Sequence, residues 1–406
     1  MREKNRKKKK SVLRESLIFL GKVIMKITFN RQEISNKIAP LMSVVSGKST
    51  LTAVEGILIE ANAPDKCTLT AFDLEKGIKI EVDATVLEEG SYIINAQKFN
   101  QTLKVMDGEE ITLTVDSKLA TLFECGKSSH RTGALKAEEF PEIPDLVTEK
   151  GFVVKQAVLK KMFNKVAYAM GVNEPRPVLN GCYVKTEVGK ISVVACDGFK
   201  LAVCSDDCEL GQLENSNRGV EYSFIVPVKS VNELVRLLSD NDEDEVTFYM
   251  SHRNMVVVFD HLIFFTRLIT GEYVDYNRII IKNHKIAVYA DKARMLAALE
   301  KAALITEERI AGSVRSHVRV EVAQDILKVS AVSTAGSIYD ELDIDHEGDD
   351  LSIAFNNRFL IDSIKGCRSD KIKLSMSSPL MSINVEPYDD ESGSELFMLL
   401  PVRTRE

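Results

Sequence analysis

The sequence is poor in the residues that build metal centres, disulfide frameworks and hydrolytic active sites. It contains seven cysteines and six histidines among 406 residues, and no two cysteines have the C-x-x-C spacing. The histidines show neither H-x-x-H nor H-E-x-x-H spacing, so we expect no metal site and no histidine general base. Scattered cysteines argue against a disulfide framework and favour a reducing, cytoplasmic location.

Long apolar runs are also missing, and none approaches the length of about 18 residues that a membrane helix needs. Residues 1–24 hold nine Lys or Arg and two acidic residues. Lys22 interrupts the short apolar stretch that follows the basic block, and no small-residue cleavage site comes after it, so secretion is not expected. We expect residues 1–24 to be a disordered basic extension upstream of a functional start at Met25. The alternative is an arm that touches the phosphates of DNA or of a membrane.

The composition is that of a folded, acidic protein with more than one domain. Hydrophobic residues make up 45% and charged residues 28% of the chain, and a length of 406 residues predicts two or three domains. The net charge is −7, and residues 1–24 carry +7, so the rest of the chain carries −14. This acidic body argues against a protein that coats nucleic acid with its whole surface, while a local basic lining stays possible.

One order of helices and strands recurs three times along the chain, which indicates an internal repeat. Each copy is expected to hold an amphipathic helix, paired strands, a second helix and further strands. The first helices are predicted at 31–45, 156–170 and 291–305, and the second helices at 96–106, 228–238 and 356–367. The paired strands are predicted at 67–82, 191–205 and 327–344, and the later strands at 111–125, 245–265 and 371–385.

The second helices share a pattern of apolar residues with spacings of three and four, which places them on one face directed at a sheet. These residues are Phe99, Leu103 and Met106, then Val231, Leu234 and Leu238, then Phe359, Ile361 and Ile364. The repeats predict an α+β protein with helices on one face of antiparallel sheets. The predicted domains are 25–147, 150–276 and 277–406.

The stretch 176–205 contains two predicted strands, 182–186 and 191–195, and a third strand, 201–204, after a turn at Asp197-Gly198. Asp and Gly suit such a turn, and we expect Asp197 to cap it. No catalytic set is present in this stretch. Small and apolar residues at its strand ends are candidates to line a shallow apolar pocket: Leu179, Cys196, Gly198 and Leu201.

Three motifs, taken together in their order along the chain, resemble those of the bacterial sliding clamps, the beta subunits of DNA polymerase III. They are Leu-Asn-Gly at 179–181, Asp-Gly-x-x-Leu-Ala-Val at 197–203 and Leu-Pro-Val-Arg at 400–403, and the resemblance runs from Met25 to the C-terminus. It implies three clamp domains per chain and a head-to-tail homodimer with six domains around a hole wide enough for duplex DNA. It also implies a non-enzymatic processivity factor without a cofactor, which an ATP-driven loader places on DNA and which then tethers polymerases.

The resemblance further implies a pocket between the second and third domains that binds peptides of the Gln-x-x-Leu-Phe kind from polymerases, the clamp loader and repair factors. Val274 stands where the family usually has Pro, and Cys196 replaces a Thr, so the motif preference of the pocket is open. The implied pocket residues are Arg176, Leu179, Cys196, Gly198, Leu201, Val274, Arg278, Ile279, Leu380, Met398, Leu400, Pro401, Val402 and Arg403.

The inner helices are expected to offer base-independent contacts to DNA. The candidates on these helices are Lys104, Lys229 and Arg236. The resemblance adds Lys48, which matches a DNA-contacting arginine of the family, and Asn173, which stands where the family has another polar contact. Lys48 lies in the sequence Ser46-Gly-Lys-Ser-Thr50, but position 42 is Met, so this loop lacks the first glycine of a nucleotide-binding loop.

The implied ring joint pairs the first domain with the third domain of the other copy. Its candidate residues are Lys98, Thr102, Met106, His130, Thr132, Leu304 and Ile305. His130 and Thr132 occupy positions where the family commonly has large apolar residues, so we predict a dimer weaker than is usual for the family.

Two other functions stay open from the residues. A monomeric clamp-like adaptor would bind the same peptides without encircling DNA, and the oligomeric state distinguishes it from a ring. A nuclease or other DNA enzyme is the second rival, and the absence of a cluster of acidic residues or histidines speaks against it.

Overall fold

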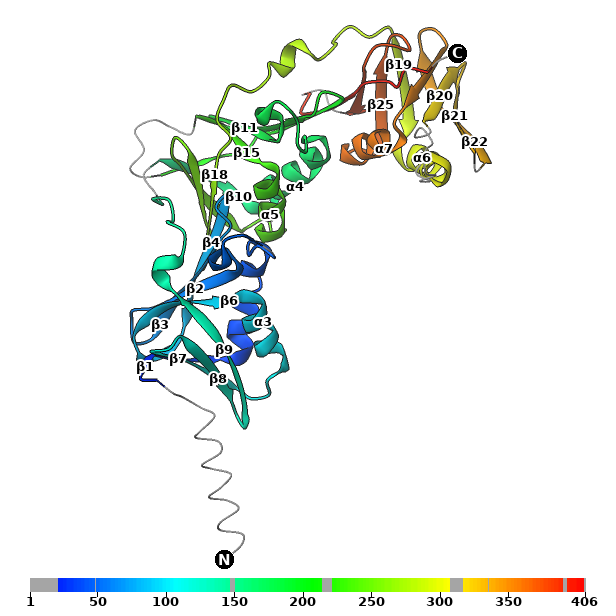
Figure 1. Ribbon diagram of the computed structural model, residues 1–406. Coiled ribbons are helices and arrows are strands. Elements are labelled where there is room, and N and C mark those ends of the chain that lie inside the picture. The colour runs from blue at the N-terminus through cyan, green and yellow to red at the C-terminus, as the bar shows by residue number, and fades with distance from the viewer. Residues whose placement is uncertain are drawn as a thin grey trace, which may run out of the picture. The chain divides into compact units, whose positions relative to one another are not determined.

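The computed structural model describes residues 21–47, 49–146, 150–213, 221–306, 317–334, 336–389 and 393–404. The chain divides into two compact units (Figure 1). Unit 1 comprises Met1–Gly151 and Val246–Arg267, and unit 2 comprises Phe152–Glu245 and Leu268–Glu406.

Unit 1 is built on antiparallel strands that carry the helices α2 (Arg31–Lys37) and α3 (Ala96–Val105). Its strands follow the order β16-β17-β18-β4-β3-β2-β6-β9-β8-β7-β1-β5. The strands are β1 (Val23–Asn30), β2 (Gly56–Ala61), β3 (Lys66–Phe72), β4 (Lys76–Asp83), β5 (Thr85–Glu88), β6 (Gly90–Asn95), β7 (Glu110–Asp116), β8 (Ala120–Cys125), β9 (Ser128–Lys136), β16 (Glu245–Met250), β17 (Asn254–Val258) and β18 (Leu262–Arg267).

Unit 2 carries the helices α4 (Gln156–Val166), α5 (Val228–Leu237), α6 (Lys292–Thr306) and α7 (Asn357–Gly366). One sheet has the order β15-β11-β12-β13-β27-β26-β25-β19-β23, and a second has the order β22-β21-β20-β24. The short strands β10 (Gly151–Lys155) and β14 (Gly211–Gln212) pair with each other. The other strands are β11 (Gly181–Glu187), β12 (Lys190–Cys196), β13 (Lys200–Asp206), β15 (Tyr222–Pro227), β19 (Ile286–Asp291), β20 (Val318–Ala323), β21 (Ile326–Ser333), β22 (Gly336–Asp343), β23 (Asp345–Glu347), β24 (Leu351–Phe355), β25 (Lys371–Met376), β26 (Ile383–Pro387) and β27 (Glu395–Leu399).

The repeated order of helix, strands, helix and strands is present three times, and the second helices lie within one residue of their predicted positions. Local capping explains their starts: the side chains of Asn95 and Asn356 accept hydrogen bonds from backbone N–H groups in the first turns of α3 and α7. The first helix of the first copy is shorter than predicted. It ends at Lys37, because Pro40 cannot continue a helix, and a 3-10 turn follows at Leu41–Ser43.

Helix α7, the second helix of the third repeat, faces its sheet differently from the prediction. Ile361 and Ile364 are buried, but Phe359 is only half-buried, and Leu360 is the buried residue of that turn. Leu360, Ile364 and Cys367 repeat the four-then-three spacing of the first copy. The prediction was wrong at Phe359 because two adjacent apolar residues leave the rotation of the helix undecided.

The folded part begins before Met25. Strand β1 starts at Val23, which pairs with Asp116, and the N–H of Ser117 donates to the carbonyl of Lys22. The expectation of a disordered extension therefore does not describe residues 21–24, while residues 1–20 lie outside the described part of the chain. Among the described residues, no helix is long and apolar enough to cross a membrane.

Candidate functional site

The central feature of unit 2 is an apolar cluster where β12, β13 and β27 meet. Its buried members are Leu179, Val194, Cys196, Leu201 and Met398. Strand pairing brings them together across the sequence, since Leu201 pairs with Cys196 on one side and with Met398 on the other. Eight partly buried residues pack against them: Val178, Tyr183, Val203, Tyr273, Val274, Tyr276, Ile280 and Leu396. We call these thirteen residues the apolar cluster.

The chain around the apolar cluster exposes further apolar side chains. Leu380 is 69% and Leu400 is 40% exposed, and Ile279 and Val402 are also exposed. The loop with Leu380 precedes β26, whose Ile383 pairs with Leu399, so this loop runs beside the C-terminal tail. Large apolar side chains left open beside a buried apolar floor are typical of a binding surface.

The turn between β12 and β13 is held as the sequence predicted. Asp197 Oδ1 accepts hydrogen bonds from the N–H groups of Phe199 and Lys200, both at 2.9 Å. Gly198 has a φ of +87°, which a glycine adopts without strain, and its N–H donates to Cys196 Sγ at 3.4 Å. Asp197 is therefore the cap of this turn.

The thiol of Cys196 lies in the floor of the apolar cluster. Burial raises its pKa above the usual value, which keeps the thiol protonated at neutral pH. A protonated, buried thiol is a poor nucleophile, so Cys196 serves as a small apolar side chain here.

The basic residues predicted at the pocket are all on the surface. Arg176 and Arg403 are exposed, and Arg278 forms an exposed ion pair with Asp275, with 2.8 Å between Nε and Oδ2. Pro401 is half-buried. The strands and turns thus bring Leu179, Cys196, Leu201, Val274 and Met398 together in the apolar cluster. The other predicted pocket residues are exposed or half-buried and do not belong to this cluster.

Sequence reasoning missed several members of this region. Phe199 is 61% exposed at the tip of the turn, and Tyr273 stacks on Tyr183 with ring centroids 5.1 Å apart inside the apolar cluster. Ile280 packs against the apolar cluster, whereas its neighbour Ile279 is exposed. The sequence did contain one indication of this region, because Tyr273 and Tyr276 are large aromatic residues next to the predicted pocket residue Val274.

Three of the residues predicted to contact DNA lie on the helices α3 and α5. Lys48 is outside the described residues. Lys104 is exposed in the last turn of α3, and Lys229 and Arg236 are exposed on α5. Seven positions separate the two α5 residues, which puts them on one face of the helix. Arg236 Nη1 lies 3.9 Å from Glu233 Oε2, and Asn173 is exposed with a φ of +60°.

The predicted joint residues of unit 1 form a polar contact. Thr102 Oγ1 lies 2.8 Å from His130 Nδ1, and the His130 ring stacks on Phe123. Thr102 and Met106 are only 2% and 5% exposed, so they pack beneath the surface. Lys98 and His130 are exposed on it. Thr132 is half-buried on β9.

The predicted joint residues of unit 2 lie in the last turn of α6. Leu304 is 75% exposed there, and Ile305 is half-buried. An exposed leucine at a helix end beside the edge strand β22 is a candidate for burial against another chain. Among the described residues, no group of three or more His, Cys, Asp or Glu side chains is placed to hold a metal ion.

Comparison with known families decides the identity of the fold. A model of the DNA polymerase III beta subunit N-terminal domain matches residues 25–144, a model of the central domain matches 153–275, and a model of the C-terminal domain matches 277–401. The chain belongs to the DNA polymerase III beta subunit family.

Relatives of known name and structure agree with this assignment. A beta sliding clamp of Staphylococcus epidermidis is 26% identical over 391 residues, which covers 94% of this chain and 100% of that protein. The Bacillus subtilis DNA polymerase sliding clamp has a TM-score of 0.85 at 23% identity, and the Thermotoga maritima DNA polymerase III beta subunit has a TM-score of 0.81 at 26% identity. Both alignments cover 94% of this chain and 100% of the relative.

The chain is thus a sliding clamp with three repeated clamp domains, and it acts as a non-catalytic processivity factor of the polymerase. The three consecutive matches favour this role over that of a monomeric peptide-binding adaptor.

Proposed function

We propose that two copies of this clamp close head to tail into a ring around duplex DNA and carry polymerases through a peptide pocket on unit 2. The observation that carries the proposal is the match of three consecutive beta subunit domains to one chain. A ring holds DNA by enclosure, so the contacts to phosphates can stay weak enough for sliding. We propose that the domains comprise residues 25–147, 150–276 and 277–406. We also propose that the protein is cytoplasmic, where its seven cysteines stay reduced.

Two open strand edges support the head-to-tail joint. Residues 128–133 of β9 pair with β8, and among the described residues no strand pairs with their other side. Likewise, β22 pairs with β21 and with no other described strand. The edges differ in charge: residues 128–133 carry Arg131 and no acidic residue, whereas β22 carries Asp340, Glu341 and Asp343 and no basic residue, with Asp340 and Asp343 paired to Lys301 and Arg294 of α6. Opposite charges favour pairing of unlike edges, which is a heterologous contact.

The first test is the absolute mass of the purified protein by light scattering over a dilution series. We expect a species of about twice the chain mass of 45.3 kDa at high concentration. The proposed joint has His130, which is hydrogen-bonded to Thr102, where the family commonly has a large apolar side chain. We therefore expect the dimer to dissociate at a higher concentration than is usual for the family. A monomer at every concentration would contradict the ring, and a subnanomolar dissociation constant would contradict the weak joint.

We propose that the apolar cluster and the exposed side chains around it bind peptides of the Gln-x-x-Leu-Phe kind from polymerases and the clamp loader. The leucine and phenylalanine of such a peptide would cover Leu380, Leu400 and the floor at Leu179 and Leu201. Burial of each anchor contributes about 1.5–3 kcal/mol, and ordering of the peptide offsets part of it. A micromolar affinity results, which suits partners that exchange.

We propose that the helix residues Lys104, Lys229 and Arg236, with Lys48 and Asn173, contact DNA phosphates. Exchange of Lys104 for Glu is expected to weaken binding to short duplex DNA, and to lower the slope of log affinity against log salt by about 1. Fluorescence anisotropy at several salt concentrations measures both.

Lys66→Glu is the matched control for this experiment. Lys66 is an exposed lysine of unit 1 on strand β3, where it pairs with Glu81, and it lies on no helix. We expect it to leave the salt slope unchanged. An equal loss of slope in both variants would attribute the effect to total charge and contradict a specific helix contact.

A further inference from the structure

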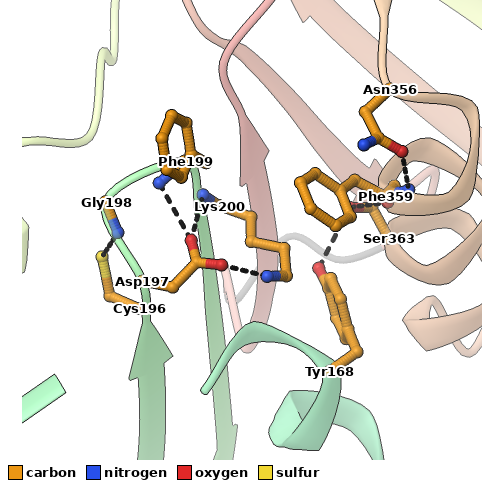
Figure 2. A network of polar contacts seen from close by, with 9 residues as sticks. All are labelled: Tyr168, Cys196, Asp197, Gly198, Phe199, Lys200, Asn356, Phe359 and Ser363. Carbon is orange, nitrogen blue, oxygen red and sulfur yellow. Dashed lines mark hydrogen bonds and ion pairs between the residues drawn. The ribbon is translucent and has the colours of Figure 1, made fainter. Parts of the chain in front are cut away.

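A buried cation lies directly beside the turn of the proposed peptide pocket. Lys200 is the first residue of β13, and its side chain is 7% exposed. Its ammonium contacts the carboxylate of Asp197 and lies 4.3 Å from the ring centroid of Phe359 (Figure 2). A buried charge is strongly destabilising without partners, so the positions of Lys200, Asp197 and Phe359 depend on one another.

On one side, this cation fixes the pocket turn. Asp197 uses Oδ1 to accept the N–H groups of Phe199 and Lys200, and Oδ2 faces the Lys200 ammonium. The turn held in this way carries the exposed Phe199 and joins Cys196 to Leu201, two floor residues of the apolar cluster. The N–H of Leu400 donates to the carbonyl of Phe199 at 2.9 Å, so the C-terminal tail follows the turn.

On the other side, the cation reaches the helix α7. Phe359 lies in the first turn of α7, where Asn356 caps its N–H. Ser363 Oγ donates to the carbonyl of Phe359 at 2.9 Å, and it also lies 3.0 Å from the hydroxyl of Tyr168, which follows α4. Phe359 is not a member of the apolar cluster, and it meets the turn through the Lys200 ammonium.

We propose that Lys200 is a positioning residue for partner binding: held between the Asp197 carboxylate and the Phe359 ring, it sets the pocket turn and couples peptide occupancy to α7. The inference rests on the proposed peptide pocket. An exposed ion pair contributes little, but Asp197 and Lys200 side chains are 11% and 7% exposed, so water does not screen their interaction. Because the Phe359 ring holds the Lys200 ammonium from α7, a change at Phe359 is expected to alter peptide affinity through the turn.

The test compares peptide affinity with thermal stability in four variants of the full chain. A fluorescent Gln-x-x-Leu-Phe peptide is titrated by anisotropy, and the melting temperature is measured in parallel. Lys200→Met keeps the length but removes the charge, and it is expected to weaken binding by about 10-fold. Lys200→Arg keeps the cation that pairs with Asp197 and is expected to lose less affinity than Lys200→Met, about 3-fold. Phe359→Leu removes the ring and is expected to weaken binding by about 3-fold.

Lys165→Met is the matched control, because Lys165 also forms a buried ion pair in unit 2, with Glu395, which pairs with Cys204, four residues along β13 from Lys200. It is expected to lower the melting temperature and leave the peptide affinity within about 2-fold. Equal affinity losses in Lys165→Met and Lys200→Met would overturn the inference, since stability alone would then account for them.

Two other outcomes separate the inference from the function on which it rests. If the wild type binds the peptide and both Lys200→Met and Phe359→Leu bind it equally well, the inference is overturned and the pocket stands. Should the wild type not bind the peptide, both are overturned. If Lys200→Met does not fold, Phe359→Leu decides, because it leaves the Asp197–Lys200 pair in place.

Discussion

Deletion of residues 400–406 is expected to lower the affinity for Gln-x-x-Leu-Phe peptides by about 100-fold, which corresponds to about 2.7 kcal/mol. The deletion removes the exposed apolar side chains of Leu400 and Val402 and the exposed Arg403. Loss of two apolar contacts to a peptide at about 25 cal/mol per Å² gives an effect of this size. Anisotropy titration of a labelled peptide measures it.

The fold should survive this deletion. Two backbone hydrogen bonds of the tail are lost, from Leu400 N–H to Phe199 and from Val402 N–H to Ala354, while β27 ends at Leu399 and stays complete. Deletion of 404–406 alone is the control, with an expected affinity within about 2-fold of the full chain, because no proposed anchor is removed. An unchanged affinity after deletion of 400–406 would remove the tail from the pocket.

The double variant Leu304→Asp, Ile305→Asp is expected to raise the dimer dissociation constant by at least about 100-fold. Each apolar anchor contributes about 1.5–3 kcal/mol when buried, and a carboxylate buried without a partner adds a further penalty. Leu304 is 75% exposed and Ile305 is half-buried in the single chain, so neither belongs to the fully buried core of unit 2. Light scattering across a dilution series measures the shift, and processive DNA synthesis should fall with it.

Val188→Asp provides the control for this experiment. Val188 is 81% exposed in the turn between β11 and β12 and belongs to neither strand edge proposed for the joint. It exchanges one exposed apolar residue for Asp, which adds one negative charge where the double variant adds two, and it is expected to leave the dimer unchanged. Equal dissociation in both variants would mean that added charge, and not the α6 end, controls association.

Local patterns predicted the features that depend on neighbouring residues. The second helices follow from apolar spacing and asparagine caps, and the Asp197 turn follows from a carboxylate that bonds N–H groups two and three residues later. Where the local pattern was ambiguous, prediction failed: Phe359 and Leu360 are both apolar, and only packing against the sheet chose Leu360.

Candidate residues of the surfaces were harder to judge from sequence. Thr102 and Met106 were expected at the ring joint, but they are buried in unit 1, where Thr102 bonds the exposed His130. Ile279 is exposed beside the proposed pocket, and its neighbour Ile280, which was not predicted, packs against the apolar cluster. The exposure of a residue depends on which distant parts of the chain pack against it. A local periodic pattern does not specify those parts.

The sequence by itself determined the threefold repeat, the family and the order of helices and strands, because these follow from spacing and short motifs. Tertiary structure alone decided that β13 pairs with β27, so that Leu201 meets Met398 and the tail runs beside the pocket turn. It alone placed the ammonium of Lys200 on the ring of Phe359. Both contacts join residues more than 150 positions apart, where strand register and close packing choose the partner and local preferences have no influence.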